Sequence, residues 1–228
     1  MNSKLVNKKL LIFDLDGTLI HSALDLAISV NLMLEKLGKN PFKEEIIHGW
    51  VGNGAHTLVW RALSGKKEVD TTLDKSYLSD ALALFLKLYE KNLCVATKPY
   101  PHVKETLTSL KSKGYRLSLV SNKPFQFIEP ILKKLALDGF FEIILGGDSL
   151  EKKKPDSLPL LYVCNTLGID ITQSVMIGDS KNDIQAANAC QMDSIAVTYG
   201  YNYGEDIALY HPSIIINDFK DLIHQMMQ

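Results

Sequence analysis

Two aspartates stand two residues apart after an apolar run near the start of the chain. Residues 10–13, LLIF, form the run, and Asp14 and Asp16 follow it, with a glycine and a threonine next. Such a run predicts a strand buried on both faces, and the carboxyl ends of strands are where open α/β folds place their chemistry. Two carboxylates this close raise each other's pKa unless a cation lies between them. The pattern favours Mg²⁺, which takes oxygen ligands and suits phosphate substrates.

A hydroxyl and an amide follow a second predicted strand. Ser121 and Asn122 come directly after the strand predicted at 116–120 and before a helical pattern. A hydroxyl and backbone N–H groups at the start of a helix can bind an anion, although a serine–asparagine pair after a strand is more often a turn. Alone, this pair is a weak indication of a phosphate site.

A lysine and two further aspartates extend the set. Lys154 ends a run of three lysines and precedes Pro155; by itself such a run is as often a solvated loop as part of a site. Asp179 follows the apolar segment 175–177, and Asp183 comes one helical turn later. Carboxylates and an ammonium group at one edge of a sheet can stabilise the charge that develops in phosphoryl transfer.

The elements that must bring these residues together are strands that alternate with helices. From residue 103 onward, strands are predicted at 116–120, 141–145, 175–177, 195–197 and 214–216. Helical patterns separate them, which is typical of a parallel sheet.

The segment between the first strand and residue 100 instead keeps helical spacing throughout. Ser22 and Asp25 form an approximate capping box at its first helix, and two prolines close to residue 100 mark a hinge-like linker. We therefore expect a doubly wound, Rossmann-like α/β core from residues 1–20 and 100–228. Residues 21–99 are expected to form an inserted, all-α helical cap.

The composition is that of an ordinary globular protein. The 228 residues carry a formal net charge of −1 with no basic block beyond the lysine run, so nothing indicates a nucleic-acid partner. No apolar run approaches the roughly 20 residues of a membrane helix, and no signal peptide is recognised. The three cysteines are far apart. We expect a cytoplasmic protein with reduced thiols, a small-molecule substrate and no membrane partner; monomer and homodimer both remain open.

The segment 14–19, DLDGTL, resembles the first motif of the haloacid dehalogenase superfamily, and the three later clusters resemble its further motifs in order. The resemblance implies the same doubly wound fold. It also implies that Asp14 is a nucleophile that becomes an aspartyl-phosphate. Asp16 would be the general acid and base, protonating the leaving oxygen and then activating water.

The same resemblance assigns the remaining site residues. Ser121, with Asn122 beside it, would hold a phosphate oxygen, and Lys154 would neutralise the nucleophile and the phosphate together. Mg²⁺ would be bound by Asp14, Asp179 and the backbone carbonyl of Asp16. Asp183 would lie behind them and hold waters, Asp179 or Lys154.

The choice of substrate is expected to come from the cap closing over the site. Residues 50–55, WVGNGA, and 198–204, TYGYNYG, resemble stretches of bacterial phosphoglycolate phosphatases, which implies 2-phosphoglycolate as the substrate. Asn53, flanked by glycines, would offer backbone N–H groups to a small carboxylate. Arg61 would supply a charge, although an exposed helix arginine is the more common outcome.

One position departs from the superfamily pattern: His21 stands where an aspartate or glutamate is usual, at the hinge to the cap. A solvated hinge residue and a pH-linked role are both open. Two alternative functions are also open. One is the same chemistry on a sugar phosphate or pyrophosphate, and the other is a catalytically silent binding module that has kept the fold.

Overall fold

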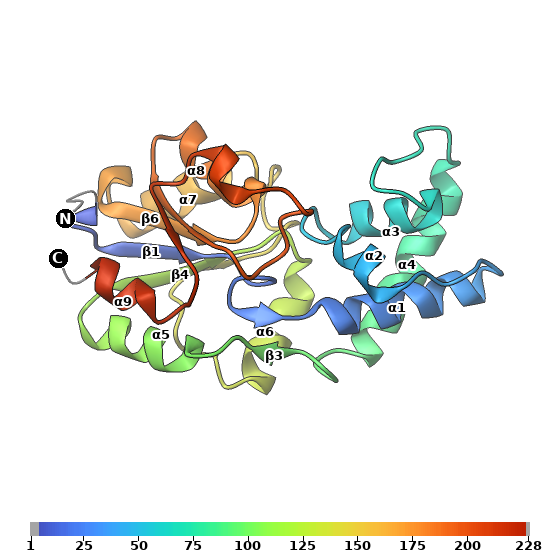
Figure 1. Ribbon diagram of the computed structural model, residues 1–228, viewed down its shortest axis with the longest axis horizontal. Helices are drawn as coiled ribbons and strands as arrows, with labels where there is room; N and C mark the ends of the chain where they lie inside the picture. Colours follow the sequence, from blue (N-terminus) through green and yellow to red (C-terminus); the bar gives the residue numbers. More distant parts are fainter. Residues whose placement is uncertain (1–4, 227–228) are drawn as a thin grey trace.

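The computed structural model describes residues 5–226, which contain a six-stranded sheet (Figure 1). In spatial order the strands are β5 (Ile144–Leu145), β4 (Arg116–Val120), β1 (Leu10–Phe13), β6 (Ser174–Gly178), β7 (Asp193–Val197) and β8 (Ile214–Ile216). Each neighbouring pair runs parallel. The predicted α/β fold class is thereby confirmed.

Strand β1 lies in the middle of the sheet, where the winding direction changes. Its Phe13 is paired with Leu119 of β4 on one side and with Ile177 of β6 on the other. The chain therefore leaves all three strands at the same edge. Open α/β folds bind ligands at this kind of reversal point. Figure 1 shows that this edge faces the inserted helices.

Helices cover both faces of the sheet. They are α5 (Val103–Ser112), α6 (Phe125–Lys134), α7 (Leu158–Leu167), α8 (Lys181–Ala189) and α9 (Asp221–Met226). Side chains alternate along β1, so that Leu11 and Phe13 join a core with α5, α6 and α9. Leu10 and Ile12 point the other way and join a core with α7 and α8. Burial on both faces explains why β1 is apolar at every position.

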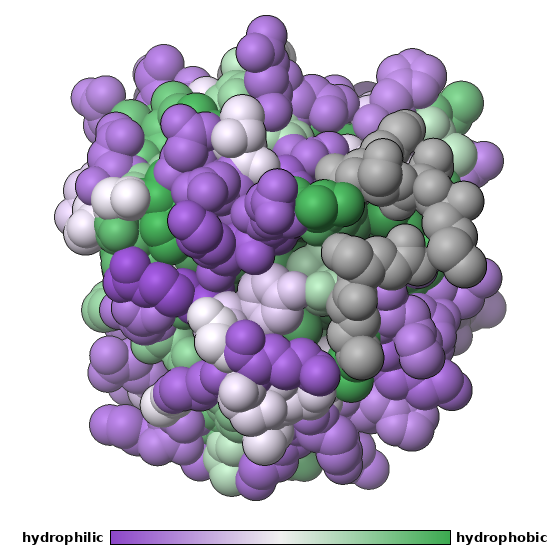
Figure 2. Space-filling model, turned by 90° about the vertical axis from the view of Figure 1, so that its left-hand side faces the viewer, coloured by the Kyte–Doolittle hydropathy of each residue, from purple (hydrophilic) through white to green (hydrophobic). Residues whose placement is uncertain are grey.

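The inserted segment contains helices α1 (Ala23–Lys36), α2 (Glu44–His48), α3 (Ala55–Ser64) and α4 (Lys75–Lys91). They gather at one end of the molecule (Figure 1). The opposite end, where the termini lie, is covered mostly by hydrophilic residues (Figure 2). Within residues 5–226 no helix combines the length and the apolar character needed to cross a bilayer. The three cysteines, all within these residues, are free thiols as expected.

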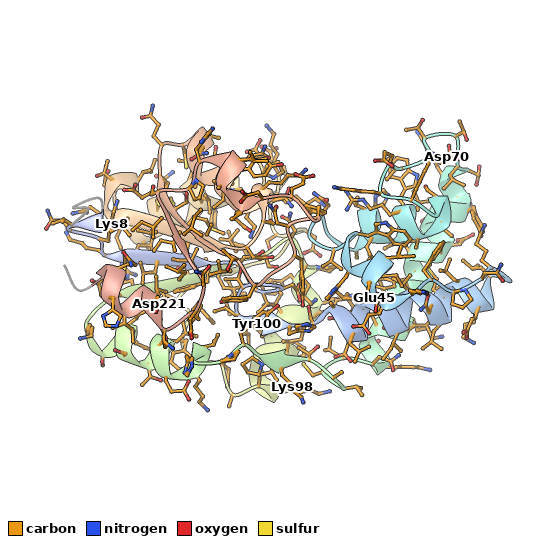
Figure 3. The ribbon with its side chains drawn as sticks, viewed as in Figure 1. Lys8, Glu45, Asp70, Lys98, Tyr100 and Asp221 are labelled. Carbon is orange, nitrogen blue, oxygen red and sulfur yellow. The ribbon has the colours of Figure 1, made fainter. Side chains whose placement is uncertain are left out.

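The two chain crossings between the sheet and the inserted helices pair with each other. Strand β2 (Ile20–His21) runs antiparallel to β3 (Lys98–Pro99), with Ile20 opposite Pro99. The sequence indicated only a hinge and a linker here. The pairing provides hydrogen-bond partners for backbone N–H and C=O groups that would otherwise lack them. Figure 3 shows Lys98 and Tyr100 at this junction.

The predicted capping box at the start of α1 is wrong. The hydroxyl of Ser22 donates to Asp16 instead of capping the helix. The carboxylate of Asp25 is buried and accepts hydrogen bonds from the backbone N–H groups of residues 95–97, at 3.1, 2.8 and 2.9 Å, and from the Thr97 hydroxyl. Asp25 therefore ties α1 to the segment that returns from α4 to the sheet.

Replacing Asp25 with alanine is expected to lower the free energy of unfolding by about 3 kcal/mol, because three backbone donors lose a charged acceptor. Chemical denaturation would measure the loss. Asp80→Ala, on an exposed position of α4, is the matched control and should change stability by less than about 0.5 kcal/mol. Equal stability of the two variants would contradict the role assigned to Asp25.

Candidate active site

Three carboxylates meet at the edge where β1 and β6 end. Asp14 follows β1, Asp179 follows β6, and Asp183 lies in the first turn of α8. Each offers a carboxylate oxygen, and the three oxygens lie within 4.8 Å of one another. The backbone N–H of Asp14 donates to the carbonyl of Ile177 at 2.9 Å, so the register of β1 against β6 sets this approach.

Lys154 lies against this cluster and is 1% exposed. Its Nζ is 3.0 Å from Oδ1 of Asp14 and 2.6 Å from Oδ1 of Asp183, and it also donates to the carbonyl of Val120 at 2.6 Å. Of the three consecutive lysines, this is the one that the motif singled out. The other two differ: Lys152 is exposed, and Lys153 donates to the carbonyl of Asn53 at 2.8 Å.

Burial perturbs the protonation of the cluster. Burial raises the pKa of Asp14 to about 7; Lys154 opposes the rise and the charge of Asp183 adds to it. The pKa of Asp179 is raised well above its usual range by burial and by the charges of Asp183 and Asp14. One ammonium group does not balance three carboxylates, of which those of Asp179 and Asp183 are buried and that of Asp14 is half-buried. Because carboxylate oxygens are hard ligands, the cluster fits a divalent cation.

Neighbouring groups hold the two later aspartates in place. Asp179 accepts hydrogen bonds from the Thr18 hydroxyl at 2.7 Å and from the backbone N–H of Tyr201 at 2.6 Å. Asp183 accepts from the N–H and hydroxyl of Ser180, at 3.0 and 2.9 Å, in a capping box that starts α8. Both carboxylates are therefore fixed before any ligand binds.

Close packing on Asp179 explains two glycines. Gly17 has a φ of +89°, and a Cβ there would lie 2.3 Å from Oδ2 of Asp179. A Cβ at Gly200 would lie 2.2 Å from the Cβ of Asp179. A side chain at either position would displace Asp179.

Asp16 is held by two groups for which the sequence motifs predicted no role. Nζ of Lys123 lies 3.0 Å from each of its carboxylate oxygens, and the Ser22 hydroxyl donates to Oδ1. The side chain of Lys123 is 3% exposed, and its Nζ lies 4.8 Å from the ring centre of Tyr89. Lys123 directly follows the predicted pair Ser121–Asn122, and this position next to predicted site residues was the one signal in the sequence that could have pointed to it.

The pair after β4 contributes in two different ways. Ser121 is buried and lines the same cavity as Asp14. The side-chain N–H₂ of Asn122 donates to the carbonyls of Lys154, at 2.9 Å, and Gly52, at 3.1 Å. Asn122 therefore joins the lysine loop to the inserted segment. The role of both residues in phosphate binding stays a prediction.

The two residues predicted from the inserted segment do not meet Asp14 in the cavity. Arg61 donates to the carbonyls of Trp50, at 2.7 Å, and Lys67, at 2.9 Å, and lines a separate groove. Asn53 lines that groove too, and its side chain bonds to Tyr203 and Asn182. The glycines on either side of Asn53 do line the cavity with Asp14. The substrate-binding roles of Arg61 and Asn53 stay predictions.

The cavity beside Asp14 and Asp16 has a volume of about 40 Å³. Ser121, Asn122 and Lys123 line its core side. Its remaining walls are mostly apolar and include Leu26, Val51, Leu58, Phe85, Tyr89 and Phe127. A volume of this size admits roughly three water-sized groups, so the cavity favours a ligand with a short tail.

His21 lies in β2 and is exposed, as expected of a solvated hinge residue. Its ring centre is 5.6 Å from that of His48, 5.7 Å from Tyr100 and 5.8 Å from Tyr201. The Tyr201 hydroxyl accepts the backbone N–H of Ser22 at 3.0 Å. This aromatic cluster fills the junction between the sheet and the inserted helices, where Figure 3 places Tyr100.

Comparison with known proteins gives consistent results. The family model described as "Haloacid dehalogenase-like hydrolase" matches residues 11–197. The chain is 50% identical to a phosphoglycolate phosphatase of Colwellia psychrerythraea, over 96% of this chain and 97% of that one. It is 46% identical to one of Psychrobacter arcticus, over 98% and 97%. A crystal structure of a predicted phosphoglycolate phosphatase from Haemophilus somnus has a TM-score of 0.89 at 38% identity, over 96% of this chain and 98% of that one.

Proposed function

This chain belongs to the haloacid dehalogenase-like hydrolases, and on that basis we propose that it is a Mg²⁺-dependent phosphatase that hydrolyses 2-phosphoglycolate to glycolate and phosphate. The observation that carries the chemistry is the contact of buried Lys154 with Asp14, 3.0 Å apart, beside two more carboxylates. The substrate is supported by phosphoglycolate phosphatases that are 43–50% identical to nearly the whole chain.

The metal would be bound by Asp14, Asp179 and the backbone carbonyl of Asp16, with Asp183 behind them. Bound Mg²⁺ supplies positive charge that offsets the negative charge of the phosphate and polarises its oxygens. Its presence would also lower the pKa values that burial raises in the cluster.

The protein groups would carry out two displacements at phosphorus. An oxygen of Asp14 attacks, the bond from phosphorus to the glycolate oxygen breaks, and Asp16 gives its proton to that oxygen. Asp16 then takes a proton from water, which attacks phosphorus and breaks the bond to Asp14. Lys154 neutralises the nucleophile and the phosphate throughout, while Ser121 holds a phosphate oxygen.

Residues 21–99 would act as a cap over a core of residues 1–20 and 100–228. The paired crossings β2 and β3 and the side chains that the inserted helices contribute to the cavity support this division. Closure of the cap would exclude water from the phosphate. The small cavity favours a two-carbon tail over a hexose. One chain supplies all these groups, so no second subunit is needed.

Steady-state assays on a panel of esters, with Mg²⁺ or with EDTA, test the proposal. We expect kcat/KM for 2-phosphoglycolate to exceed that for glucose 6-phosphate and pyrophosphate by on the order of 100-fold. EDTA should lower turnover by at least about 100-fold, and added Mg²⁺ should restore it. A higher kcat/KM for glucose 6-phosphate would contradict the assignment of 2-phosphoglycolate as the substrate. Turnover that is unchanged by EDTA would contradict the proposed dependence on Mg²⁺. If the protein hydrolysed none of these esters, the result would favour the catalytically silent binding module.

A further inference from the structure

The cavity beside Asp14 contains one positively charged side chain among the described residues that line it. That side chain is Lys123, and the opposing walls are mostly apolar. An anionic group that enters this cavity is removed from water and needs a charged partner there. Arg61, the arginine predicted for this purpose, is turned toward the other groove.

The position of Lys123 is fixed by its backbone. Its carbonyl accepts the N–H of Gly147 at 2.8 Å, and its own N–H donates to the Ser121 hydroxyl at 3.3 Å. These bonds fix the backbone of Lys123, and the ion pair with Asp16 holds its ammonium group beside the phosphate end of the cavity. Lys123 is 5% exposed, so neighbouring side chains restrict it further.

The ammonium group also has unused hydrogen-bonding capacity. A lysine ammonium has three donors. Two of them reach the two oxygens of Asp16, each at 3.0 Å, while the ring of Tyr89 covers one side. The ammonium group makes no further hydrogen bond to the described residues, so it can also bind a ligand oxygen in the cavity.

The proposed reaction determines where a carboxylate on the substrate must lie. In 2-phosphoglycolate one methylene group separates the carboxylate from the oxygen that leaves phosphorus. Asp16 protonates that oxygen, so the carboxylate lies within a few ångströms of Asp16, where Nζ of Lys123 already is. We propose, on the basis of this proposed function, that Lys123 binds the substrate carboxylate and selects esters with an anionic tail.

Lys123→Met tests this proposal by comparing two esters. Ethyl phosphate has the same two-carbon length as 2-phosphoglycolate but lacks the carboxylate. The ratio of kcat/KM for 2-phosphoglycolate to that for ethyl phosphate should fall on the order of 100-fold in the variant. Any effect that acts only through Asp16 lowers both values equally and cancels in the ratio. Lys153→Met, the half-buried lysine of the other groove, is the matched control and should keep the wild-type ratio.

Each outcome of this comparison is decisive. An unchanged ratio in Lys123→Met, with a wild type that prefers 2-phosphoglycolate, would overturn the role of Lys123 and leave the proposed function intact. A wild type that shows no preference for the carboxylate would overturn the substrate and this proposal together. Should Lys123→Met not fold, as judged by thermal melting, Lys123→Gln keeps a donor for Asp16 but no charge. The same fall in the ratio is expected for it.

Discussion

Asp14→Asn is expected to lower turnover of 2-phosphoglycolate by roughly 10⁵-fold while the fold stays intact. The amide has nearly the shape of the carboxylate but lacks the anionic oxygen that attacks phosphorus. Lys154 keeps Asp183 as a partner at 2.6 Å, so the substitution leaves no unpaired charge on the lysine. Single-turnover measurements with excess enzyme would detect the residual rate.

The same variant should not be less stable in the absence of metal. An acid whose pKa is raised on folding, as burial raises that of Asp14 to about 7, binds its proton more tightly in the folded state. Stability is therefore lost as the pH rises through 7 and this group ionises. The amide of the variant does not ionise, so in EDTA at pH 8 the variant should melt at the wild-type temperature or above it. With Mg²⁺ the wild type should gain more stability than the variant.

Asp138→Asn is the control for this experiment, because Asp138 is an exposed acid away from the sheet edge that carries the cluster. It should keep wild-type turnover and stability. Retention of more than about 1% of turnover in Asp14→Asn would place the nucleophile elsewhere.

The positions of the aspartates and of Ser121 could be predicted because their signals are local. Asp14, Ser121 and Asp179 come after apolar strands, and parallel strands bring these ends to one edge. The pairing of Phe13 with both Leu119 and Ile177 places these ends side by side. The strand predicted at 141–145 is shorter, Ile144–Leu145, since β5 lies at the sheet edge and pairs only with β4.

The contacts that hold those residues could not be predicted, because their partners are far apart in the sequence. Lys123 pairs with Asp16 across 107 residues, and Thr18 bonds to Asp179 across 161. A lysine in a turn is usually solvated, so the position of Lys123 beside Ser121 and Asn122 did not by itself indicate that its ammonium group is buried against Asp16. The wrong prediction of a capping box at Asp25 has the same cause. The backbone N–H groups that bond to its carboxylate lie about 70 residues later in the chain, and these bonds replace the predicted local one.

The two-residue strands β2 and β3 escaped prediction for another reason. Strand patterns are recognised by alternation over four or more residues, and Ile20–His21 and Lys98–Pro99 are too short to show it. Their pairing depends only on the two crossings being adjacent in space.

Lys154→Met is expected to reduce both stability and turnover. Removing the lysine leaves Asp14 and Asp183 buried without the ammonium that lies 3.0 and 2.6 Å away. Breaking a buried charge pair in this way costs about 3–5 kcal/mol. Turnover should fall roughly 10³-fold, because one preorganised charge is lost at the transferring phosphate. Denaturation in EDTA and steady-state kinetics in saturating Mg²⁺ would measure the two effects separately.

The stability loss in Lys154→Met should depend on pH in a defined direction. Burial disfavours the charged form of Lys154, but Asp14 and Asp183 outweigh burial and raise its pKa, so its charge stays constant between pH 6 and 8. Asp14, with a pKa of about 7, takes up a proton as the pH falls through this range. A protonated, neutral Asp14 is stabilised much less by the ammonium group of Lys154 than an ionised one is. The difference in free energy of unfolding from the wild type should therefore be smaller at pH 6 than at pH 8.

The adjacent lysine provides the control that isolates the buried charge. Lys153 stands next to Lys154 in the same loop but bonds to a backbone carbonyl, that of Asn53, rather than to a carboxylate. Lys153→Met should therefore show neither the pH-dependent stability loss nor the 10³-fold fall in turnover expected for Lys154→Met. If the two variants behaved alike, the contact between Lys154 and Asp14 would have no special role. The chemistry would then have to rest on the carboxylates and the metal alone.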